Sequence, residues 1–504
     1  MQRPPLEKEK PFALISSGIP GLDGVLCGGF TPNRLYMIEG TPGAGKTTLA
    51  LQFLIEGARQ GESVLYVTLS ESEAELRMVA ASHNWGLEGI TIHEVIPDEQ
   101  MLDPGQQYTI FHPSEVELGD TTKNILSRVE AVKPTRVVID SLSELRLLAG
   151  NPLKYRRQVL AYKQYFAKRN CTVLMLDDRT AQEHDLEVKS IAHGVISLEQ
   201  VEQAYGSDRR RLRIQKYRGV GFRTGFHDYG IRQGGLVVYQ RLTASESRVI
   251  REQTQLSSGI EGLDQLLGGG LESGTSTLIN GPSGTGKSTI AAQFVSAAVQ
   301  RGQHAAMFLF EESKSTLLNR TDQIGISLRQ LVEGGQVSIQ QVDPAELAPG
   351  EFAHAVQEAV DVDGAAIVVI DSLNGYLNAT PDERFLITHM RELLTYLAQR
   401  GVMTILIGVQ SGLIGSMASA VDMSYLADNV VLMRHFEYQG EVKQAVSVFK
   451  KRGSQHEKSI REFWIASDGV HVGEPLLRFR GVLTGVPVYQ GEQEEIHGHK
   501  PGRR

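Results

Sequence analysis

The sequence has little cysteine: Cys27 and Cys171 are the only two thiols among 504 residues. Two are too few for a disulfide framework or a thiolate metal site, which favours a reducing, cytoplasmic location. The opening MQRPPLEKEKPFALISSG has no apolar core of signal-peptide length, and no stretch approaches the roughly 20 apolar residues that cross a bilayer. We therefore expect neither a targeting signal nor a membrane contact.

Positive charge is not in excess either. The chain has 51 lysines and arginines against 59 acidic residues, a formal charge of −8 and a pI of about 6.0. This balance gives no general attraction to a nucleic acid backbone, so such a partner would need a local basic surface. The composition, 41% hydrophobic and 22% charged, is typical of globular proteins, and the length indicates two to four domains.

The chain contains an internal repeat. SSGIPGLDGVLCGGF from Ser16 matches SSGIEGLDQLLGGGL from Ser257, and the register holds without a gap to Glu71 and Glu312. The period far exceeds the roughly 20 to 50 residues of solenoid repeats, so each copy should fold independently. We predict a first domain over residues 1–243, a linker over 244–256, a second domain over 257–489 and a short polar tail over 490–504.

Each copy alternates strand-like runs with helical segments. RLYMIEG and TSTLING lead into glycine loops, and KTTLALQFLIEGARQG and KSTIAAQFVSAAVQRG follow with apolar residues at helical spacing. Later runs such as RVVIDS and AIVVIDS are continuous and β-branched, as in strands buried on both faces. We predict an α/β fold of two tandem P-loop NTPase domains, with mostly parallel central sheets covered by helices.

The glycine loops are the strongest functional signal. GTPGAGKT (residues 40–47) and GPSGTGKS (residues 281–288) each lie between a strand and a helix, where glycines let backbone N–H groups surround phosphates and the lysine adds a cation. The alternative is that these glycine loops bind no nucleotide. Because the pattern occurs twice, this alternative is the weaker interpretation. The predicted contacts with ATP in these loops are Thr41, Gly43, Ala44, Gly45, Lys46, Thr47, Gly284, Thr285, Gly286, Lys287, Ser288 and Thr289.

A triphosphate bound with Mg²⁺ also needs a carboxylate at the end of a neighbouring strand. The segment VVID supplies one in each copy, at Asp140 and Asp371. Together with the loop hydroxyls of Thr47 and Ser288, these carboxylates are the predicted Mg²⁺ ligands.

Hydrolysis needs a further carboxylate to polarise the attacking water. The strand after the loop helix ends in FLFEES in the second copy, with Glu311 and Glu312 adjacent. In the first copy it ends in VTLSES, where Ser70 leaves Glu71 alone. We predict that these three glutamates are catalytic and that the two sites differ in rate or in reaction; solvated strand-end acids are the alternative.

Each copy also carries a K-x-R-G segment: RIQKYRGVGF contains Lys216 and Arg218, and VFKKRGSQH contains Lys450 and Arg452. Strand alternation places the lysine and the arginine on one face, where two cations could stabilise charge on a γ-phosphate. These residues are remote in sequence from the loops, so they could act on the nucleotide of a neighbouring subunit. A solvated basic hairpin is the alternative.

The chain resembles the KaiC family over nearly its whole length. The likeness lies in the SSGIxGLD openings, both phosphate loops, FEES, both IDS strands, GEVKQAVSVFKKRGSQHEKSIREF and RFRGVLTGVP. These proteins are two-domain ATPases and autokinases of the cyanobacterial clock, within the larger RecA-like group. The resemblance implies a homohexamer of two stacked rings with ATP between subunits, the K-x-R-G cations reaching across each interface, and nucleotide contacts that include Ser82.

The resemblance further implies that the first ring mainly hydrolyses ATP slowly, whereas the second phosphorylates and dephosphorylates its own hydroxyls. Counting back from ADNVVLM places the acceptor at Ser424. Tyr425 departs from the usual Ser or Thr, so we predict phosphorylation of Ser424 alone, with Glu311 or Glu312 as base. An ordinary loop serine is the alternative.

Other departures concern the first domain and the tail. Ser70 replaces an acid, and Val220 and Phe222 stand where the family has polar residues. The family's tail acts through a separate activator, and the tail here is short, polar and expected to be disordered. We therefore expect no KaiA-like activator, whereas a KaiB-like or other signalling partner stays open.

A second hypothesis is a DNA-dependent ATPase related to RecA, RadA or the helicases. The basic segment SDRRRLRIQKYRG, with Arg209 to Arg211, is better explained as part of the strand that carries Lys216 and Arg218. No helix-turn-helix, zinc module or RNA-binding signature is present in the sequence. DNA binding is therefore not expected; a nucleotide-binding scaffold with little turnover is a third interpretation.

Overall fold

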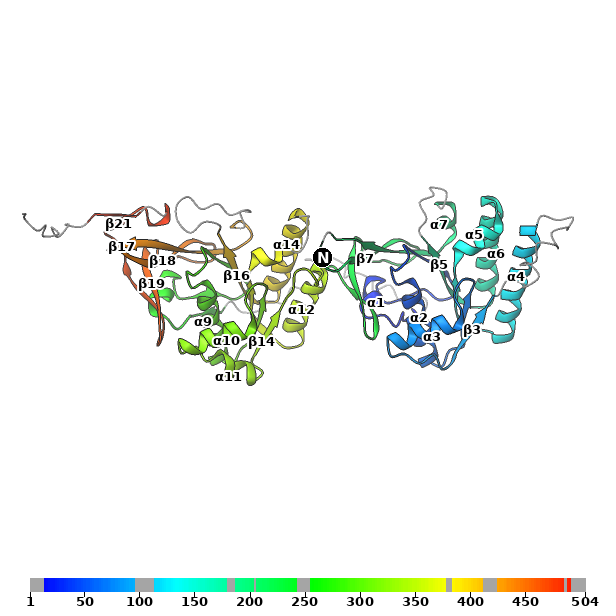
Figure 1. Cartoon of the computed structure of the whole chain (residues 1–504), viewed down its shortest axis with the longest axis horizontal. Helices are drawn as coiled ribbons and strands as arrows, with labels where there is room; N and C mark the ends of the chain where they lie inside the picture. The colour runs from blue at the N-terminus through cyan, green and yellow to red at the C-terminus, as the bar shows by residue number, and fades with distance from the viewer. Residues whose placement is uncertain are drawn as a thin grey trace, which may run out of the picture. The chain divides into compact units, whose positions relative to one another are not determined.

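The computed structural model describes residues 13–95, 113–178, 186–203, 205–242, 254–377, 383–410, 424–484 and 487–490. The chain separates into two compact units, Met1–Arg241 and Leu242–Arg504 (Figure 1). Residue 243 at the end of the predicted first domain, residues 244–253 of the predicted linker and residues 491–504 of the predicted tail lie outside the described part.

In the described part of the first unit, one nine-stranded sheet forms the centre. The first six strands of the sheet order run parallel, and the last three are antiparallel. In that order the strands are β3 (Ile90–Glu94), β2 (Val64–Thr68), β4 (Arg136–Asp140), β5 (Thr172–Asp178), β1 (Leu35–Gly40), β6 (Gly194–Val201), β7 (Arg209–Tyr217), β8 (His227–Arg232) and β9 (Gly235–Tyr239).

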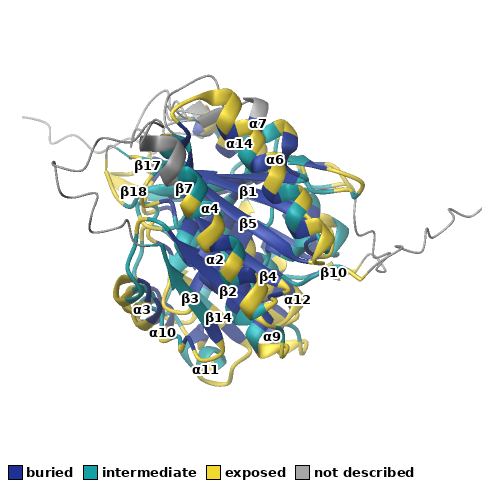
Figure 2. Ribbon diagram, turned by 90° about the vertical axis from the view of Figure 1, so that its right-hand side faces the viewer, coloured by how far each residue is buried: buried dark blue, intermediate teal, exposed yellow. Residues whose placement is uncertain are grey.

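Helices cover both faces of this sheet. Tyr36 and Ile38 pack with α1, α2 and α3, whereas Leu35 and Met37, which alternate with them along β1, pack with α4 to α7. Burial on both faces explains why the strands read as continuous apolar runs (Figure 2). The helices are α1 (Leu22–Val25), α2 (Lys46–Arg59), α3 (Glu73–Ser82), α4 (Pro113–Val132), α5 (Leu142–Ala149), α6 (Pro152–Lys168) and α7 (Leu186–Ile191).

The described part of the second unit repeats this order, with a nine-stranded sheet in which six strands run parallel and three antiparallel. The strands in sheet order are β14 (Val337–Gln341), β13 (His304–Leu309), β15 (Ala365–Asp371), β16 (Met403–Val409), β12 (Ser276–Gly281), β17 (Asn429–Tyr438), β18 (Glu441–Lys451), β19 (Ile460–Ala466) and β20 (Gly469–Pro475).

The helices of the second unit also divide between the two faces. Ile279 of β12 packs with α8 to α11, and its neighbour Leu278 packs with α12 to α14. These helices are α8 (Glu261–Leu266), α9 (Lys287–Gln300), α10 (Lys314–Gln323), α11 (Leu328–Glu333), α12 (Pro349–Asp361), α13 (Leu373–Leu377) and α14 (Glu383–Gln399). Shorter elements are β10 (Gln255–Leu256) paired with β11 (Leu271–Glu272), β21 (Phe479–Arg480) paired with β22 (Val488–Tyr489), and a 3-10 helix over Val482–Thr484.

The two units are therefore copies of one α/β architecture, which confirms the predicted fold class. Each glycine loop connects a central strand to the helix behind it: β1 to α2 in the first unit, and β12 to α9 in the second. Because parallel strands share a direction, their carboxyl ends bring the loop and the acids of neighbouring strands together at one edge of the sheet.

In the described part of the chain, we find no helix with the length and apolarity needed to span a membrane.

Candidate nucleotide sites

Both glycine loops have the backbone that a phosphate cradle needs. Gly45 and Gly286 precede the first residue of their helices with φ angles of 88° and 90°, in the left-handed region. A Cβ on Gly45 would lie 2.6 Å from Ile231, and one on Gly286 would lie 2.8 Å from Phe463. Conformation and space both demand glycine here, so that the N–H groups at the helix start stay open to an anion.

The two loop lysines have different partners. Lys46 Nζ donates to the carbonyls of Gly40 and Thr41, both at 3.0 Å, and forms an ion pair with Asp178 Oδ1 at 2.8 Å. Strand register pairs Gly40 with Asp178, whereas Gly281 pairs with Val409, so the second unit has no carboxylate at this position. A phosphate bound in the first loop would therefore share Lys46 with Asp178.

Lys287 Nζ donates to the carbonyl of Pro282 at 2.6 Å. Burial lowers the pKa of Lys287 to about 8, although Asp371 and Glu311 act in the opposite direction. A bound phosphate would favour the protonated lysine. The second loop is thus arranged to gain charge stabilisation when an anion binds.

The predicted metal-binding carboxylates lie against the loop hydroxyls. Asp140 interacts with the hydroxyl of Thr47, and Tyr66 donates to Asp140 Oδ2 at 2.6 Å. Asp371 interacts with the hydroxyl of Ser288. Burial raises the pKa of each aspartate, against the lowering effect of these hydroxyls and of the loop lysine.

Both aspartates are buried, but Asp371 lacks the tyrosine donor that Asp140 has. Its Oδ2 is buried and has no hydrogen-bond partner among the described residues. The tyrosine that donates to Asp140 comes from β2, and the matching position of β13 is Met307, which has no hydroxyl. A buried, unpartnered carboxylate oxygen beside a serine hydroxyl fits a Mg²⁺ ion.

The predicted catalytic glutamates follow β2 and β13 in a turn that ends in a helix cap. Ser72 caps α3 and Ser313 caps α10, each accepting a hydrogen bond from a backbone N–H three residues on. Glu71 Oε2 is buried and has no hydrogen-bond partner among the described residues. Burial raises the pKa of Glu71, Asp140 and Glu75 add to this rise, and Lys46 opposes it.

The matching carboxylate of the second unit is held by an arginine. Arg320 of α10 donates to Glu312 from Nε at 3.2 Å and from Nη2 at 2.9 Å, and its Nη1 donates to Thr289 Oγ1 at 2.6 Å. The adjacent Glu311 accepts from Ser372 Oγ at 2.7 Å. Arg320 therefore connects Glu312 to the loop helix, and the repeat places Val79 at this position in the first unit.

The K-x-R-G cations lie away from the phosphate loop of their own unit. Lys216 pairs across the sheet with Val195 and so with Met37, three residues before the end of β1. Lys450 has the same relation to β12, through Val430 and Leu278. Three residues of strand correspond to about 10 Å. The lysines are thus displaced toward the amino end of the central strand, whereas the loop follows its carboxyl end.

Ser424 lies beside the second of these cation pairs. Lys450 Nζ donates to the carbonyls of Ser424 and Ala427, at 3.0 and 2.7 Å, and Arg452 forms an ion pair with Asp428 at 3.3 Å. Tyr425 is 45% exposed, and the guanidinium of Arg391 lies over its ring. The predicted acceptor is therefore on the same side of the sheet as the cations, displaced from the loop of its own unit.

The first unit has no hydroxyl residue at the position that matches Ser424. Counting back from the paired strands β6 and β17 places Lys189 there, and Lys189 forms an ion pair with the buried Glu39 at 2.6 Å. Ser82, another predicted contact, is the last residue of α3, and its hydroxyl donates to the carbonyl of Val79 at 2.7 Å.

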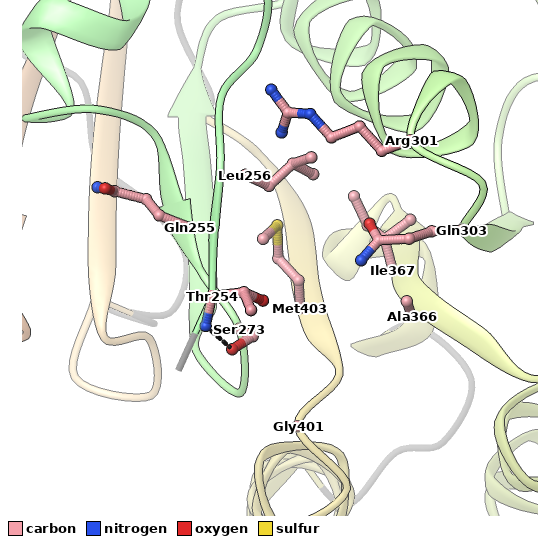
Figure 3. A pocket seen from close by; sticks show the side chains of 10 residues that line it. All are labelled: Thr254, Gln255, Leu256, Ser273, Arg301, Gln303, Ala366, Ile367, Gly401 and Met403. Carbon is pink, nitrogen blue, oxygen red and sulfur yellow. Dashed lines mark hydrogen bonds between the residues drawn. The ribbon is translucent and has the colours of Figure 1, made fainter. Parts of the chain in front are cut away.

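A separate pocket of about 440 Å³ lies in the second unit (Figure 3). Its lining includes Ile367 and Met403, near the amino ends of β15 and β16, together with Thr254 and Ser273. Asp371 stands at the opposite end of β15. This pocket is therefore not the phosphate site.

Sequence reasoning missed three side chains of these sites: Asp178, Tyr66 and Arg320. The acids at the end of TVLMLDD gave a partial signal for Asp178, but only strand order puts β5 beside β1. Tyr66 and Arg320 belong to none of the motifs found in the sequence, so nothing in the sequence placed them in the sites.

In each unit one strand separates the loop strand from the strand that ends in the metal-binding aspartate, so Asp140 and Asp371 lie on the second strand away from the loop and not on the adjacent one as predicted. Two sheets of this order, each with a glycine loop after its central strand and an aspartate at the end of that second strand, define a protein with tandem RecA-like P-loop NTPase domains. A KaiC ATPase family profile matches residues 15–243 and 256–476. The chain belongs to the KaiC ATPase family.

Individual members of this family are similar to the chain over nearly their full length. The chain is 27% identical over 501 residues to the circadian clock protein KaiC3 of Synechocystis sp., covering 96% of this chain and 97% of that protein. It is 26% identical over 519 residues to the circadian clock oscillator protein KaiC of Parasynechococcus marenigrum, covering 98% of each. Family membership confirms the predicted resemblance and supports a KaiC-like, ATP-binding ATPase function.

The DNA-dependent alternative gains no support. Arg211 of the basic segment forms an ion pair with Glu199 at 3.0 Å, and its guanidinium lies over the ring of Phe226. The segment is thus part of β7 and its surroundings, as the sequence indicated.

Proposed function

We propose that the protein is a homohexameric ATPase in which each domain binds ATP at a subunit interface, and that the second domain also transfers phosphate to Ser424. One observation carries this proposal: in both units the phosphate loop and the K-x-R-G cations lie toward opposite ends of the central strand. Cations in that position can reach a γ-phosphate held by a neighbouring copy more readily than one held by their own loop.

Mg²⁺ would be held by Thr47 and Asp140 in the first domain and by Ser288 and Asp371 in the second. Among the described residues, no cluster of three or more His, Cys, Asp or Glu could hold a metal by itself. The ion would therefore share its ligands with the phosphates, and when bound it supplies positive charge to the β- and γ-phosphoryl oxygens.

In the first domain we assign hydrolysis to Glu71. Glu71 is half-buried, its Oε2 is buried without a hydrogen-bond partner among the described residues, and the carboxylate is close enough to Asp140 and Lys46 to interact with both. A carboxylate with a raised pKa accepts a proton from water more readily than an exposed one. Lys189, at the position that matches Ser424, leaves this domain without an acceptor hydroxyl there.

In the second domain we assign the role of base to Glu311. Arg320 occupies both oxygens of Glu312, whereas Glu311 accepts one hydrogen bond from a side chain of the described residues, that of Ser372. The Ser424 hydroxyl gives its proton to Glu311 of the subunit that holds the ATP. The Ser424 oxygen then bonds to the γ-phosphorus, the bond to the β-phosphate oxygen breaks, and ADP leaves.

Intact mass spectrometry after incubation with ATP and Mg²⁺ tests the kinase assignment. We expect one added phosphate per chain, absent in Ser424→Ala and retained in the control Ser459→Ala, which changes another serine of the second domain. If the wild-type chain releases phosphate from ATP but gains no mass, the kinase assignment is wrong and the ATPase assignment stands.

Lys287→Ala tests the second nucleotide site. This lysine is buried beneath the loop, so its loss should abolish incorporation and weaken the assembled ring, as measured by light scattering. Lys46→Ala is the matched change in the first domain and should lower hydrolysis while leaving the second loop intact. Normal incorporation in Lys287→Ala would refute the assignment.

A further inference from the structure

The first unit buries an arginine at a position where the second unit has a pocket. The side chain of Arg136, the first residue of β4, is fully buried. It donates to Glu62 from Nε at 2.9 Å and from Nη2 at 2.8 Å. Its Nη1 donates to the carbonyls of Ser16 and Phe53, at 2.9 and 3.0 Å. A cation and its carboxylate therefore fill the interior of the first unit at the amino end of β4.

The second unit has Ile367 where the first has Arg136. Strand register fixes this correspondence, because Arg136 pairs with Val64 and Ile367 with Ala305, which occupy the same place in the repeat. Isoleucine is too short to reach the position of a guanidinium, and Ile367 lines the pocket of about 440 Å³. This volume lies within the roughly 300 to 1,000 Å³ of small-molecule sites. The second unit thus has a cavity of ligand size beside the residue that replaces the buried arginine.

The charges beside this position are exchanged as well. The first unit has Gln60 and Glu62 after α2, and the repeat places Arg301 and Gln303 there in the second unit. Both of these side chains line the pocket, and its lining contains no carboxylate. Among the described residues, no carboxylate forms an ion pair with Arg301. The pocket therefore offers one cation that lacks a partner of opposite charge in this part of the chain.

The rest of the lining is largely apolar. Leu256, Ile367 and Met403 are buried, and their side chains gather in the middle of the pocket (Figure 3). Arg301 and Gln303 extend from the segment between α9 and β13. A guanidinium and an amide beside an apolar surface suit a ligand that combines a small anionic group with an apolar body.

We propose that this pocket binds a small carboxylic acid with an apolar body. The carboxylate accepts hydrogen bonds from Arg301 and Gln303, and the body packs against Leu256, Ile367 and Met403. One cation balances one negative charge, which favours a carboxylate over a phosphate group of nearly two charges. The bound ligand completes, with the signs exchanged, the ion pair that the first unit builds from its own side chains. The site is separate from both phosphate loops and does not depend on the proposed function.

Three probes with one body and different charge test the site: hexanoate, hexanamide and protonated hexylamine. The full chain, with both loops saturated with ADP and Mg²⁺, is titrated in a calorimeter, and hexanoate should bind most tightly. Arg301→Gln, which copies the first unit, should weaken hexanoate binding at least about tenfold and leave hexanamide unchanged. Arg301→Lys should restore most of the binding. Lys458→Gln, the same loss of charge at an exposed position of the second unit, should have no effect.

A second variant closes the pocket in the way the first unit does. A Cβ on Gly57 would lie 2.7 Å from Cδ of the buried arginine, and the matching residue of the second unit is Ala298. The substitutions Ala298→Gly, Arg301→Gln, Gln303→Glu and Ile367→Arg together therefore copy the first unit. This variant should melt cooperatively and should not bind hexanoate, because a paired guanidinium takes the space of the ligand.

Hexanoate binding of equal strength in the wild type, in Arg301→Gln and in the four-substitution variant would overturn the proposal. Hexylamine binding at least as tightly as hexanoate, or no saturable hexanoate binding to the wild type, would overturn it too. If the four-substitution variant does not fold, the comparison of hexanoate with hexanamide in Arg301→Gln decides. None of these titrations measures ATP turnover, so failure of the ATPase assignment would be seen separately.

Discussion

At the scale of single residues, the two domains differ most in the carboxylate that follows the strand after the loop helix. Glu71 is half-buried, and its buried Oε2 has no partner among the described residues, whereas Glu312 receives two hydrogen bonds from Arg320. The guanidinium of Arg320 thus occupies both carboxylate oxygens of Glu312. The same position in the repeat thus has a carboxylate oxygen without a partner among the described residues in one domain, and a carboxylate held in an ion pair in the other.

Glu71→Gln should slow hydrolysis in the first domain by about 100-fold, because general-base catalysis typically contributes this much. The base must be deprotonated to act. Since burial raises the pKa of Glu71, wild-type activity should fall, as pH is lowered, at a pH above the ordinary glutamate value of 4.5. This acid limb should disappear in Glu71→Gln.

The measurement is a pH–rate profile in the Lys287→Ala background, at a protein concentration where light scattering shows assembled rings, so that hydrolysis comes from the first domain. Glu88→Gln removes an exposed glutamate and serves as the control. An unchanged profile in Glu71→Gln would mean that another group, or none, takes the proton.

The sequence predicted which residue types end each strand, but not which side chains meet. Asp140 and Asp371 were found because an acid after a β-branched run is a local pattern. The contact between Asp178 and Lys46 depends on β5 lying beside β1, and the contact between Tyr66 and Asp140 depends on β2 lying beside β4. Strand order is a property of the whole sheet, so no window of sequence contains it.

At the scale of elements, α3 and α10 are matching helices that present different side chains toward the same turn. Each begins at a serine cap, and α10 carries Arg320 where α3 carries Val79. The sequence does not show that one arginine of this helix reaches both Glu312 and Thr289. The difference between the domains is therefore a property of one helix position.

Exchanging this position should exchange the behaviour of the two carboxylates. Val79→Arg should pair Glu71 and lower first-domain hydrolysis about tenfold, with the acid limb moved to lower pH. Arg320→Val should release Glu312 and raise hydrolysis in the second domain by a similar factor. Each is measured with the lysine of the other loop changed to alanine.

Arg329→Val is the matched control, because Arg329 of α11 forms an ion pair with Asp322 of α10, and no hydrogen bond or ion pair among the described residues joins it to the loop helix or to the glutamates. If both exchanges leave rates and pH profiles unchanged in folded protein, Arg320 has only a structural role.

At the scale of the whole molecule, the repeat gives two units with identical strand order and different side chains at matching positions of their sites. The sequence contained the repeat, the loops and the strands, so the fold class could be predicted. The domain bounds and the assembly are not settled by pattern, since interfaces between copies leave little trace in one sequence. In the proposed ring, the phosphate loop of one subunit meets the K-x-R-G cations of its neighbour.

Mixing two inactive variants tests the ring. Lys287→Ala lacks a second-domain loop lysine but keeps the cations, and Arg452→Ala keeps the loop but lacks a cation. In a 1:1 mixture of subunits, about a quarter of the interfaces combine the intact halves, so about a quarter of the phosphate incorporation should return. Each variant alone, treated identically, is the control, and no recovery after confirmed exchange would exclude sites shared between subunits.

The separation of loop and cations along each central strand also bears on how much enzyme a cell must hold. A chain that needs a neighbour to complete its site has little activity when it is alone, so specific activity should fall on dilution and recover on concentration. Abundance would then set both the number of molecules and the fraction of them that can work. Such a protein responds to its own expression level more steeply than one whose active site is built within a single chain.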